Sequence, residues 1–529
     1  MSRKETEAKL RYARYYAGVL YATSQLYQKG NDDLANGLNR LDLEWENIRQ
    51  GQRWAANLAP NNHAAAELCS RYPDAGVYSL ELRQHPNERI QWLQDALQAA
   101  RQLNDRYCET ACLGNLGLAY TMLALYQEAI AYHQQSLAID QELQHKNGIA
   151  SDWNNLGAIY QNLGDYTQAE QYITQAQELF ERLSDRRGEA LALLNLGNVK
   201  NSRGQFEQAT QYLQKLLPIV EEIGDLHLAA GALNSLGLSY TYLGQTERAV
   251  EMYQRARNIF QIIKNQREEA KVLNNLGLLR MESGNTDHAL EYFQTALNLA
   301  MQLGDPVNQS NALSNIATCW AARGNLDLAL DYHLQHLELT SKMNYLPGKA
   351  NALGNLGLLY AARKDYSRAA QYYTEQLTLC EKIQDRRGVC AALGNLGILH
   401  KSQGQLERAD ELYQQQLSLA KEMGDRQITA NALTNLGNVY AGHGRVAEAI
   451  GLHREALQIF ETLGYQPSAA AAHFNLACAL AEEGALQEAV SEVKAALSIY
   501  QQIHHPAESI VNSQLAAWLS EIQDSEQSL

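Results

Sequence analysis

Two groups of residues in this chain have the chemistry and the spacing of a possible active or metal site. His333 and His336 are three residues apart on a predicted helix, close to Glu338, a spacing that could hold a metal ion. Cys108 and Cys112 are four residues apart on another predicted helix and could form a redox or metal-binding pair. Both groups also have a plainer interpretation, as residues that pack between helices.

The residues at equivalent positions favour packing. At intervals of forty residues, or multiples of forty, the position of His333 holds apolar or aromatic residues: Ile173, Tyr253, Phe293, Tyr373 and Tyr413. Cysteine is commonly buried as a small apolar side chain. The chain also lacks a GxxxxGK[ST] loop, a GxGxxG turn after a strand, HExxH and GxSxG. We therefore expect no catalytic residue, no metal site and no cofactor, and predict that the chain is not an enzyme.

A third group of polar residues recurs with a strict period. One helix position holds asparagine in nine of ten successive forty-residue units, and Ser235 is the exception. The asparagines are Asn115, Asn155, Asn195, Asn275, Asn315, Asn355, Asn395, Asn435 and Asn475. Asparagine is a mediocre helix former, so its repeated use at a mid-helix position that we expect to be exposed needs a reason. Its amide carries a donor and an acceptor, so a row of amides could pair with the backbone of an extended peptide.

Two neighbouring positions extend this candidate peptide-binding site. Asn198 and Asn438 stand three residues after members of the asparagine row. Arg187, Arg267 and Arg387 share a position at the predicted edge of the same surface, where they could select acidic partners. The alternative is that the asparagines bond to neighbouring helices and only stiffen the molecule, and the sequence leaves both interpretations open.

The elements that position these residues follow from the forty-residue period. Each unit predicts a helix A, a loop, a helix B and a second loop. In helix A, Leu113, Leu116 and Tyr120 form one apolar side. At 100° per residue, positions 111, 115, 118 and 122 lie on the opposite side. The asparagine row is therefore predicted to face away from the core, onto the concave side of a solenoid.

Small residues also recur in every unit. Gly117 inside helix A costs about 1 kcal/mol relative to alanine, which makes sense if a second helix passes close by. Ala129 is the matching small residue on helix B. A loop glycine such as Gly164 permits positive φ. Pro218 lies inside the predicted helix B of the third unit, where we expect it to kink the helix or end it early.

The regular units cover only part of the chain. We predict two helices at about 5–28 and 32–57 within an N-terminal cap. The full division is a helical cap at 1–61, a degenerate first repeat at 62–105, ten units at 106–505, and a C-terminal capping helix and tail at 506–529. Because each unit of a solenoid buries its core only against its neighbours, the two ends need caps.

The spacing Leu-Gly-x2-Tyr followed by Ala-x3-aromatic resembles the tetratricopeptide repeat. The forty-residue units are similar to those of adaptors of the Partner-of-Inscuteable type and, less closely, to those of kinesin light chains. Residues 1–100, with Trp45 and Trp54, are similar to the helical arm of bacterial STAND-class signalling proteins. The resemblance implies an all-α, right-handed superhelical α-solenoid that binds peptides through the asparagine position.

Composition restricts the class of partner. The formal net charge is −15 without a basic face, which argues against nucleic acid and against an anionic membrane surface. The seven cysteines include no CxxC pair, which fits a reduced intracellular protein, so we expect a cytoplasmic location. Either end of the array could pair with another copy, and the sequence leaves the oligomeric state open.

We therefore predict a non-catalytic scaffold or adaptor that binds a protein or an extended peptide on the concave face, in bacterial signalling or regulation. Two alternatives stay open. One is a peptide-sensing regulatory receptor that resembles the Rap-type sensors, in which a signal peptide compacts the solenoid. The other is a subunit of an enzyme or ATPase assembly.

Overall fold

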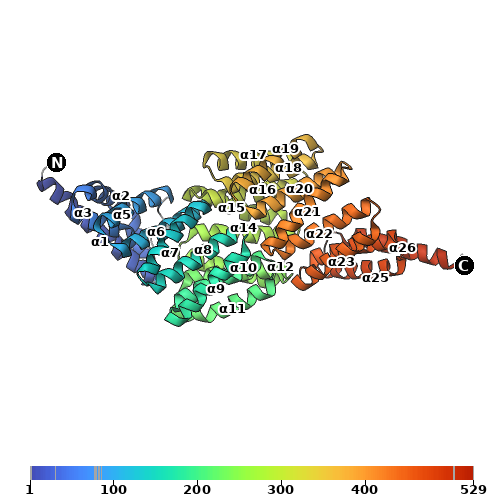
Figure 1. Cartoon of the computed structure of the whole chain (residues 1–529), viewed down its shortest axis with the longest axis horizontal. Coiled ribbons are helices and arrows are strands. Elements are labelled where there is room, and N and C mark those ends of the chain that lie inside the picture. The colour runs from blue at the N-terminus through green and yellow to red at the C-terminus, as the bar shows by residue number, and fades with distance from the viewer. Residues whose placement is uncertain are drawn as a thin grey trace.

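Every regular element in the described part of the chain is a helix. The computed structural model describes residues 3–29, 31–76, 80, 84, 86–503, 505 and 507–527. The helices stack in chain order into an elongated superhelical solenoid with its termini at opposite ends (Figure 1). The predicted all-α solenoid is confirmed. Parts of the predicted cap, degenerate repeat and tail lie outside the described residues: 1–2, 30, 77–79, 81–83, 85, 506 and 528–529.

The N-terminal region has an aromatic core of its own. The rings of Trp45 and Trp92 stack with centroids 5.9 Å apart, and Tyr72 meets Trp92 edge-on at 5.8 Å. These contacts join the predicted cap to the segment before the first regular unit. The described elements here are α1 (Arg3–Lys29), α2 (Asn31–Leu58), η1 (Ala59–Asn61), α3 (His63–Ala75) and α5 (Pro86–Leu103).

Ten helix pairs follow, one for each forty-residue unit, and we number the units 1 to 10. The helices A are α6 (Arg106–Met122), α8 (Lys146–Asn162), α10 (Arg186–Ser202), α12 (Leu226–Tyr242), α14 (Gln266–Glu282), α16 (Pro306–Ala322), α18 (Leu346–Ala362), α20 (Arg386–Ser402), α22 (Arg426–Gly442) and α24 (Gln466–Glu482). The helices B are α7 (Tyr126–Glu142), α9 (Tyr166–Leu183), α11 (Phe206–Ile223), α13 (Thr246–Ile262), α15 (Thr286–Leu303), α17 (Leu326–Lys342), α19 (Tyr366–Lys382), α21 (Leu406–Met423), α23 (Val446–Leu463) and α25 (Leu486–Gln502). The last helix, α26 (Glu508–Gln527), packs on α25.

The two helices of a unit approach closely because glycine on helix A faces a large ring on helix B. A Cβ added to Gly357 would lie 2.5 Å from the ring of Tyr373, and one added to Gly397 would lie 2.5 Å from Tyr413. A real Cβ does not approach a ring so closely, so the glycine is required by packing. This confirms the predicted role of the mid-helix glycine.

Helix starts and ends also follow the sequence. Asp185 and Asp385 are N-caps, because they accept hydrogen bonds from the backbone N–H of Gly188 and Gly388, each at 2.9 Å. The predicted early end of helix B in unit 3 is wrong, because α11 continues through Pro218 to Ile223. Proline removes one backbone donor, but Leu216 and Ile219 beside it are buried, so tertiary packing holds the helix together.

The helices A form the inner layer of the superhelix. Each helix A contacts the helix A of the next unit, from α6 with α8 to α22 with α24, as well as its own helix B. The side of helix A turned away from helix B therefore faces the axis of the superhelix. We call this side the inner face and define it by positions 111, 115, 118 and 122 of unit 1 and their equivalents.

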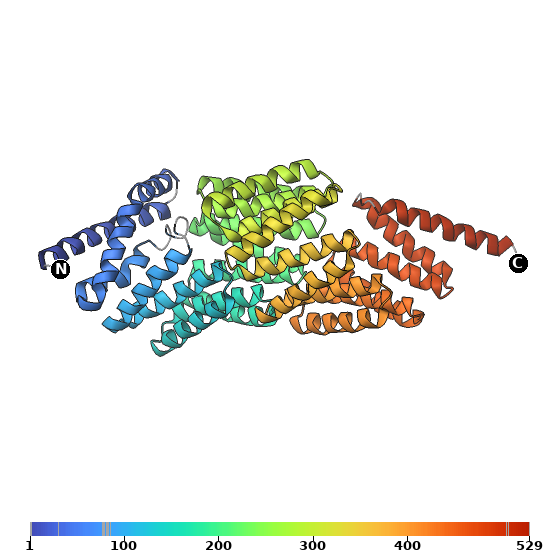
Figure 2. The same cartoon turned by 90° about the horizontal axis from the view of Figure 1, so that it is seen from above.

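The superhelix also touches itself. Gln127 of unit 1 donates a hydrogen bond to Gln384, at the start of unit 8, over 3.0 Å and across 257 residues of sequence. Figure 2 shows this arrangement, with the cyan helices of the early units beside the orange helices of the late ones. Successive superhelical turns are thus in direct contact.

Candidate functional site

The histidine pair that could have held a metal is part of the core. His333 and His336 are buried, and burial lowers the pKa of each to about 4. The Nε2 atom of His336 is 2.5 Å from the Oγ atom of Ser310. Among the described residues, no group of three or more His, Cys, Asp or Glu side chains is arranged to hold a metal ion. The structure places both histidines where the packing interpretation expects them.

The two cysteines are covered to different extents, because Cys112 is buried and Cys108 is half-buried. Burial raises the pKa of Cys108 to about 11 and raises that of Cys112 further, so both thiols stay protonated near neutral pH. Cys112 packs in an apolar cluster with Leu113 and Leu116. Protonated thiols are poor nucleophiles and poor metal ligands.

The asparagine row is half-buried rather than exposed, because the next helix A packs beside it. Four members donate a side-chain hydrogen bond to the helix A of the preceding unit. The pairs are Asn195 to Asn154 Oδ1 at 3.0 Å, Asn275 to Asn234 Oδ1 at 2.9 Å, Asn315 to Asn274 Oδ1 at 3.3 Å, and Asn355 to Ser314 Oγ at 2.8 Å. These four asparagines tie neighbouring units together.

The other asparagines of the row are different. Within the described residues, the side-chain amides of the other five, Asn115, Asn155, Asn395, Asn435 and Asn475, have no hydrogen-bond partner. Each keeps a donor and an acceptor available at a half-buried position. The row therefore contains bonded members in the middle of the array and unbonded members towards both ends.

Asn198 and Asn438 occupy the inner face one turn along the same helices, and both are half-buried. Asn198 accepts a hydrogen bond of 2.7 Å from the hydroxyl of Ser235 in the next unit. No side-chain partner of Asn438 lies among the residues that the structure describes.

The three arginines at the edge of the inner face fall into two classes. Arg187 and Arg267 each form an ion pair of 3.1 Å with the N-cap aspartate of the next unit, Asp225 and Asp305. Arg387 has no ion pair or side-chain hydrogen bond within the described part of the chain. The first two guanidinium groups are therefore already neutralised by the repeat itself.

An apolar row that sequence reasoning missed runs beside the asparagines. At position 118 and its equivalents, four large apolar side chains are exposed, with Leu358 and Ile398 exposed by 51% and 54%. The four are Leu118, Leu278, Leu358 and Ile398. Reading this position through all ten units, rather than noting only Asn198 and Asn438, would have revealed the row.

The inner face of units 6 to 9 is uncharged. Its residues include neither acids nor bases: Asn311, Asn315, Thr318, Ala322, Asn351, Asn355, Leu358, Ala362, Ala391, Asn395, Ile398, Ser402, Asn431, Asn435, Asn438 and Gly442. In a chain with 19% charged residues, such a surface offers amide groups and apolar contact without ion pairing.

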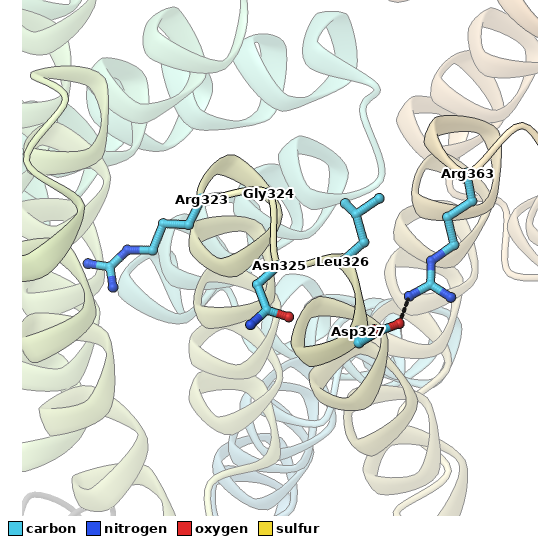
Figure 3. Close-up of a pocket in the computed structure, with 6 residues that line it drawn as sticks. All are labelled: Arg323, Gly324, Asn325, Leu326, Asp327 and Arg363. Atoms are coloured by element: carbon cyan, nitrogen blue, oxygen red, sulfur yellow. Dashed lines mark hydrogen bonds and ion pairs between the residues drawn. The ribbon is translucent and has the colours of Figure 1, made fainter.

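Two hollows lie outside the inner face. One, of about 630 Å³, lies at the loop between α16 and α17, where Arg363 pairs with Asp327 at 2.5 Å and Arg323 points away (Figure 3). The other, of about 560 Å³, lies between the N-terminal part of α18 and the outer side of α19, near Leu353 and Leu379. Neither brings together a nucleophile, a base and an oxyanion donor, which catalysis would require.

Comparison with known protein families identifies the repeat. Models of the tetratricopeptide repeat match residues 110–143, 149–222, 189–262, 227–302, 268–342, 308–382, 388–462 and 451–502. No curated protein sequence matches this one. No helix in the described part of the chain is long and apolar enough to cross a membrane.

Several solved structures align with parts of this chain. A Rap protein complexed with competence and sporulation factor aligns with a TM-score of 0.50 and 13% identity, over 72% of this chain and 99% of that one. BtubC (BKLC) from P. vanneervenii aligns at 0.34 and 22%, over 42% and 91%. The apo form of RapI aligns at 0.40 and 16%, over 52% and 98%. At these identities the likeness concerns the fold alone.

Proposed function

Because this chain belongs to the tetratricopeptide repeat family, we propose that it is a non-catalytic interaction scaffold that binds a partner protein through an extended peptide segment on its inner face. The observation that carries the proposal is the pairing of unbonded amides with exposed apolar side chains in unit 8 and its neighbours. Asn395 lies one helical turn from Ile398, and Asn435 follows one unit later. Amides of this kind bind a peptide backbone, and the apolar row contacts its side chains.

The bonded asparagines can also contribute to binding on the inner face. Asn275, Asn315 and Asn355 each use an N–H to bond the preceding unit. The Oδ1 atom of each remains available as an acceptor for a ligand N–H. One amide can thus fix the spacing of two units and still contact a peptide, so the stiffening and binding interpretations are compatible.

The uncharged inner face of units 6 to 9 indicates how a partner is selected. A charged side chain placed there would lose hydration without gaining an ion pair, so a segment with apolar contact residues is favoured. Arg387, which lacks an ion pair in the described structure, is the arginine best placed to add an acidic contact at the edge. Arg187 and Arg267 would first have to release Asp225 and Asp305.

A bacterial regulatory setting is part of the proposal. A peptide-sensing receptor is the second candidate function. The Rap protein, which has a similar fold, was solved in complex with competence and sporulation factor. The contact between superhelical turns supports it further, because a closed superhelix offers a short peptide contacts from several units at once.

The test is capture of partners from the native organism by matched variants. Asn395→Ala with Asn435→Ala removes unbonded amides on the inner face, and Asn258→Ala with Asn298→Ala removes exposed asparagines on helices B. We expect the first pair to lose a specific protein that wild type and the second pair both retain, with an unchanged melting temperature. An identical set of partners for all three proteins would contradict the proposal.

A further inference from the structure

The contact between superhelical turns is an extended seam. It packs the loops between helices A and B of units 1 to 4 against the loops that precede units 8 to 10. Along it, Gln127 meets Gln384, Asp165 lies 3.9 Å from Arg386, and Gly204 faces Gln427. Two further contacts continue the line: Gly164 with Arg387, and the rings of Tyr242 and Tyr465, whose centroids are 5.5 Å apart.

The seam buries apolar side chains from both turns. Tyr166 of unit 2 is only 1% exposed and shares one apolar cluster with Cys390, Ala420 and Met423 of unit 8. Phe206 of unit 3 is buried beside Tyr465. Burial of this kind favours the closed superhelix.

The sequence is specialised for this contact. The first residue of helix B is aromatic in three of the four seam units, as Tyr126, Tyr166 and Phe206, whereas unit 4 begins with Thr246. Where the same loops face no second turn, the first residue is mostly smaller or aliphatic: Thr286, Leu326, Leu406, Val446 and Leu486, with Tyr366 the exception. A Cβ added to the loop glycines 284, 324, 404 and 444 would meet nothing within 4 Å. Aromatic residues are therefore concentrated where the seam forms.

One buried group opposes closure. The carboxylate of Asp425 is 0% exposed, and its Oδ2 atom has no hydrogen-bond partner among the described residues. Burial raises the pKa of Asp425, although Arg387 and Arg203 act in the opposite direction. An unpartnered buried acceptor destabilises the state that buries it.

The same position in other units shows what Asp425 lacks. Asp225 and Asp305 cap their helices and also form ion pairs with Arg187 and Arg267, at equivalent positions of the repeat. Asp425 caps α22 through Ile428 N at 2.9 Å. Arg387, its counterpart arginine, instead lies beside the loop of unit 2, with its Cβ 3.6 Å from where a Cβ of Gly164 would be. In the closed seam, Arg387 and Asp425 therefore form no ion pair, although the equivalent residues of two other units do.

We propose that the seam is a releasable contact, a clasp, that holds the superhelix closed. In the closed form Arg387 packs against the loop of unit 2, and in the open form it forms an ion pair with Asp425. Aromatic burial favours closure, and the unpaired Asp425 favours opening. Opening changes the spacing of the inner face between units 2 and 8. The consequence for partner binding rests on the proposed function, whereas the opening itself does not.

A disulfide tests the clasp directly. A Cβ on Gly204 would lie 3.5 Å from the Cβ of Gln427, within the range that a disulfide spans. Gly204 has a positive φ of 73°, but Ala124 and Lys364 hold equivalent loop positions at 55° and 63°, so cysteine is tolerated. Gly204→Cys with Gln427→Cys therefore locks the seam when oxidised, and each single variant is a control.

Hydrogen exchange of the seam amides is the first measurement. In wild type and in the reduced double variant, we expect these amides to exchange at least about tenfold faster than the helix cores, and oxidation to remove that difference. If seam amides of the unlocked protein exchange only with global unfolding, the seam is a fixed part of the fold and the proposal fails. Partner capture by the oxidised protein then measures whether locking the seam changes partner binding, separately from whether the seam opens.

A matched pair of aspartates tests the exchange of partners. Asp425→Asn keeps an N-cap but removes the buried charge, so we expect seam opening to slow by about tenfold. Asp225→Asn, at an equivalent position away from the seam, should leave seam exchange unchanged. Equal effects of the two variants, or faster opening in Asp425→Asn, would overturn the assignment of Arg387 and Asp425.

Discussion

At the scale of single residues, the amide of asparagine supplies two different functions in one row. Asn355 bonds Ser314 in the preceding unit at 2.8 Å, whereas Asn395 has no side-chain partner in the described structure. Both residues stand in the same Asn-Leu-Gly triplet, so the triplet alone cannot distinguish them. The difference comes from the neighbouring helix, where Ser314 offers a hydroxyl and Gly354 offers no side chain.

This difference predicts separate effects on stability. Asn195→Ala, Asn275→Ala and Asn355→Ala each remove a hydrogen bond between units, so each should lower the free energy of unfolding by about 1 kcal/mol. Asn395→Ala should leave it unchanged or raise it slightly, because alanine is the better helix former. Urea unfolding followed by circular dichroism measures both, and equal losses at Asn355 and Asn395 would contradict the assignment.

The buried histidines predict a pH dependence. Burial lowers the pKa of His333 and of His453 to about 4, below the ordinary value of about 6.5. The unfolded chain therefore binds a proton first as the pH falls, and stability is lost between about pH 6.5 and pH 4. Phenylalanine already fills this position as Phe293. His453→Phe should remove about 2 kcal/mol of that loss at pH 5, measured as thermal stability against pH.

At the scale of elements, glycine on helix A and a large side chain on helix B, most often a ring, form the unit of packing. This explains why a helix-breaking residue recurs inside every regular helix A up to Gly437, except in unit 6, where Ala317 replaces it. It also explains why histidine is accepted at positions 133 and 453, since the imidazole ring fits against Gly117 and Gly437.

A pair of glycine variants checks this packing. Gly357→Ala places a Cβ 2.5 Å from the ring of Tyr373, so we expect a loss of about 1 to 3 kcal/mol. Gly451→Ala lies in an exposed part of α23 with nothing within 4 Å, so the gain in helix propensity should stabilise by up to about 1 kcal/mol. Effects of the same sign in both variants would contradict the account.

The helix pairs, their caps and their inner face could be predicted from sequence, because each depends on residues within one unit. The Asp185 N-cap and the facing Gly357 and Tyr373 are examples. The seam could not be predicted, because the meeting of Tyr166 with Met423 depends on small rotations accumulated over several units. The pairing of Asn195 with Asn154 likewise depends on how two units are spaced.

At the scale of the whole molecule, the array has two covered ends and one contact that joins distant units. Trp518 on α26 is buried in an apolar cluster with Val490, Val493 and Tyr500 of unit 10. Without the seam, such an array would respond to change only locally, since units contact only their neighbours. The seam adds direct contacts between units 2 and 8, which the chain otherwise joins only through the units between them.

The packing of α26 on unit 10 predicts that a change there affects hydrogen exchange only in neighbouring helices. Trp518→Ala removes most of a buried ring, so hydrogen exchange should become faster in α24 and α25. Exchange in α6 to α9 should not change, because those helices contact unit 10 only through intervening units and the seam does not reach α26. Faster exchange in both regions would show that the array unfolds as a single cooperative body.

Photo-crosslinking tests the central claim, binding on the inner face, most directly. A photoreactive amino acid at Leu358, on the inner face, is compared with one at Met301, which is 62% exposed on helix B of unit 5. We expect position 358 to form a covalent adduct with a partner from the native organism, and position 301 to form none. Crosslinking from 301 with none from 358 would place the binding surface on the outside of the solenoid and contradict the account.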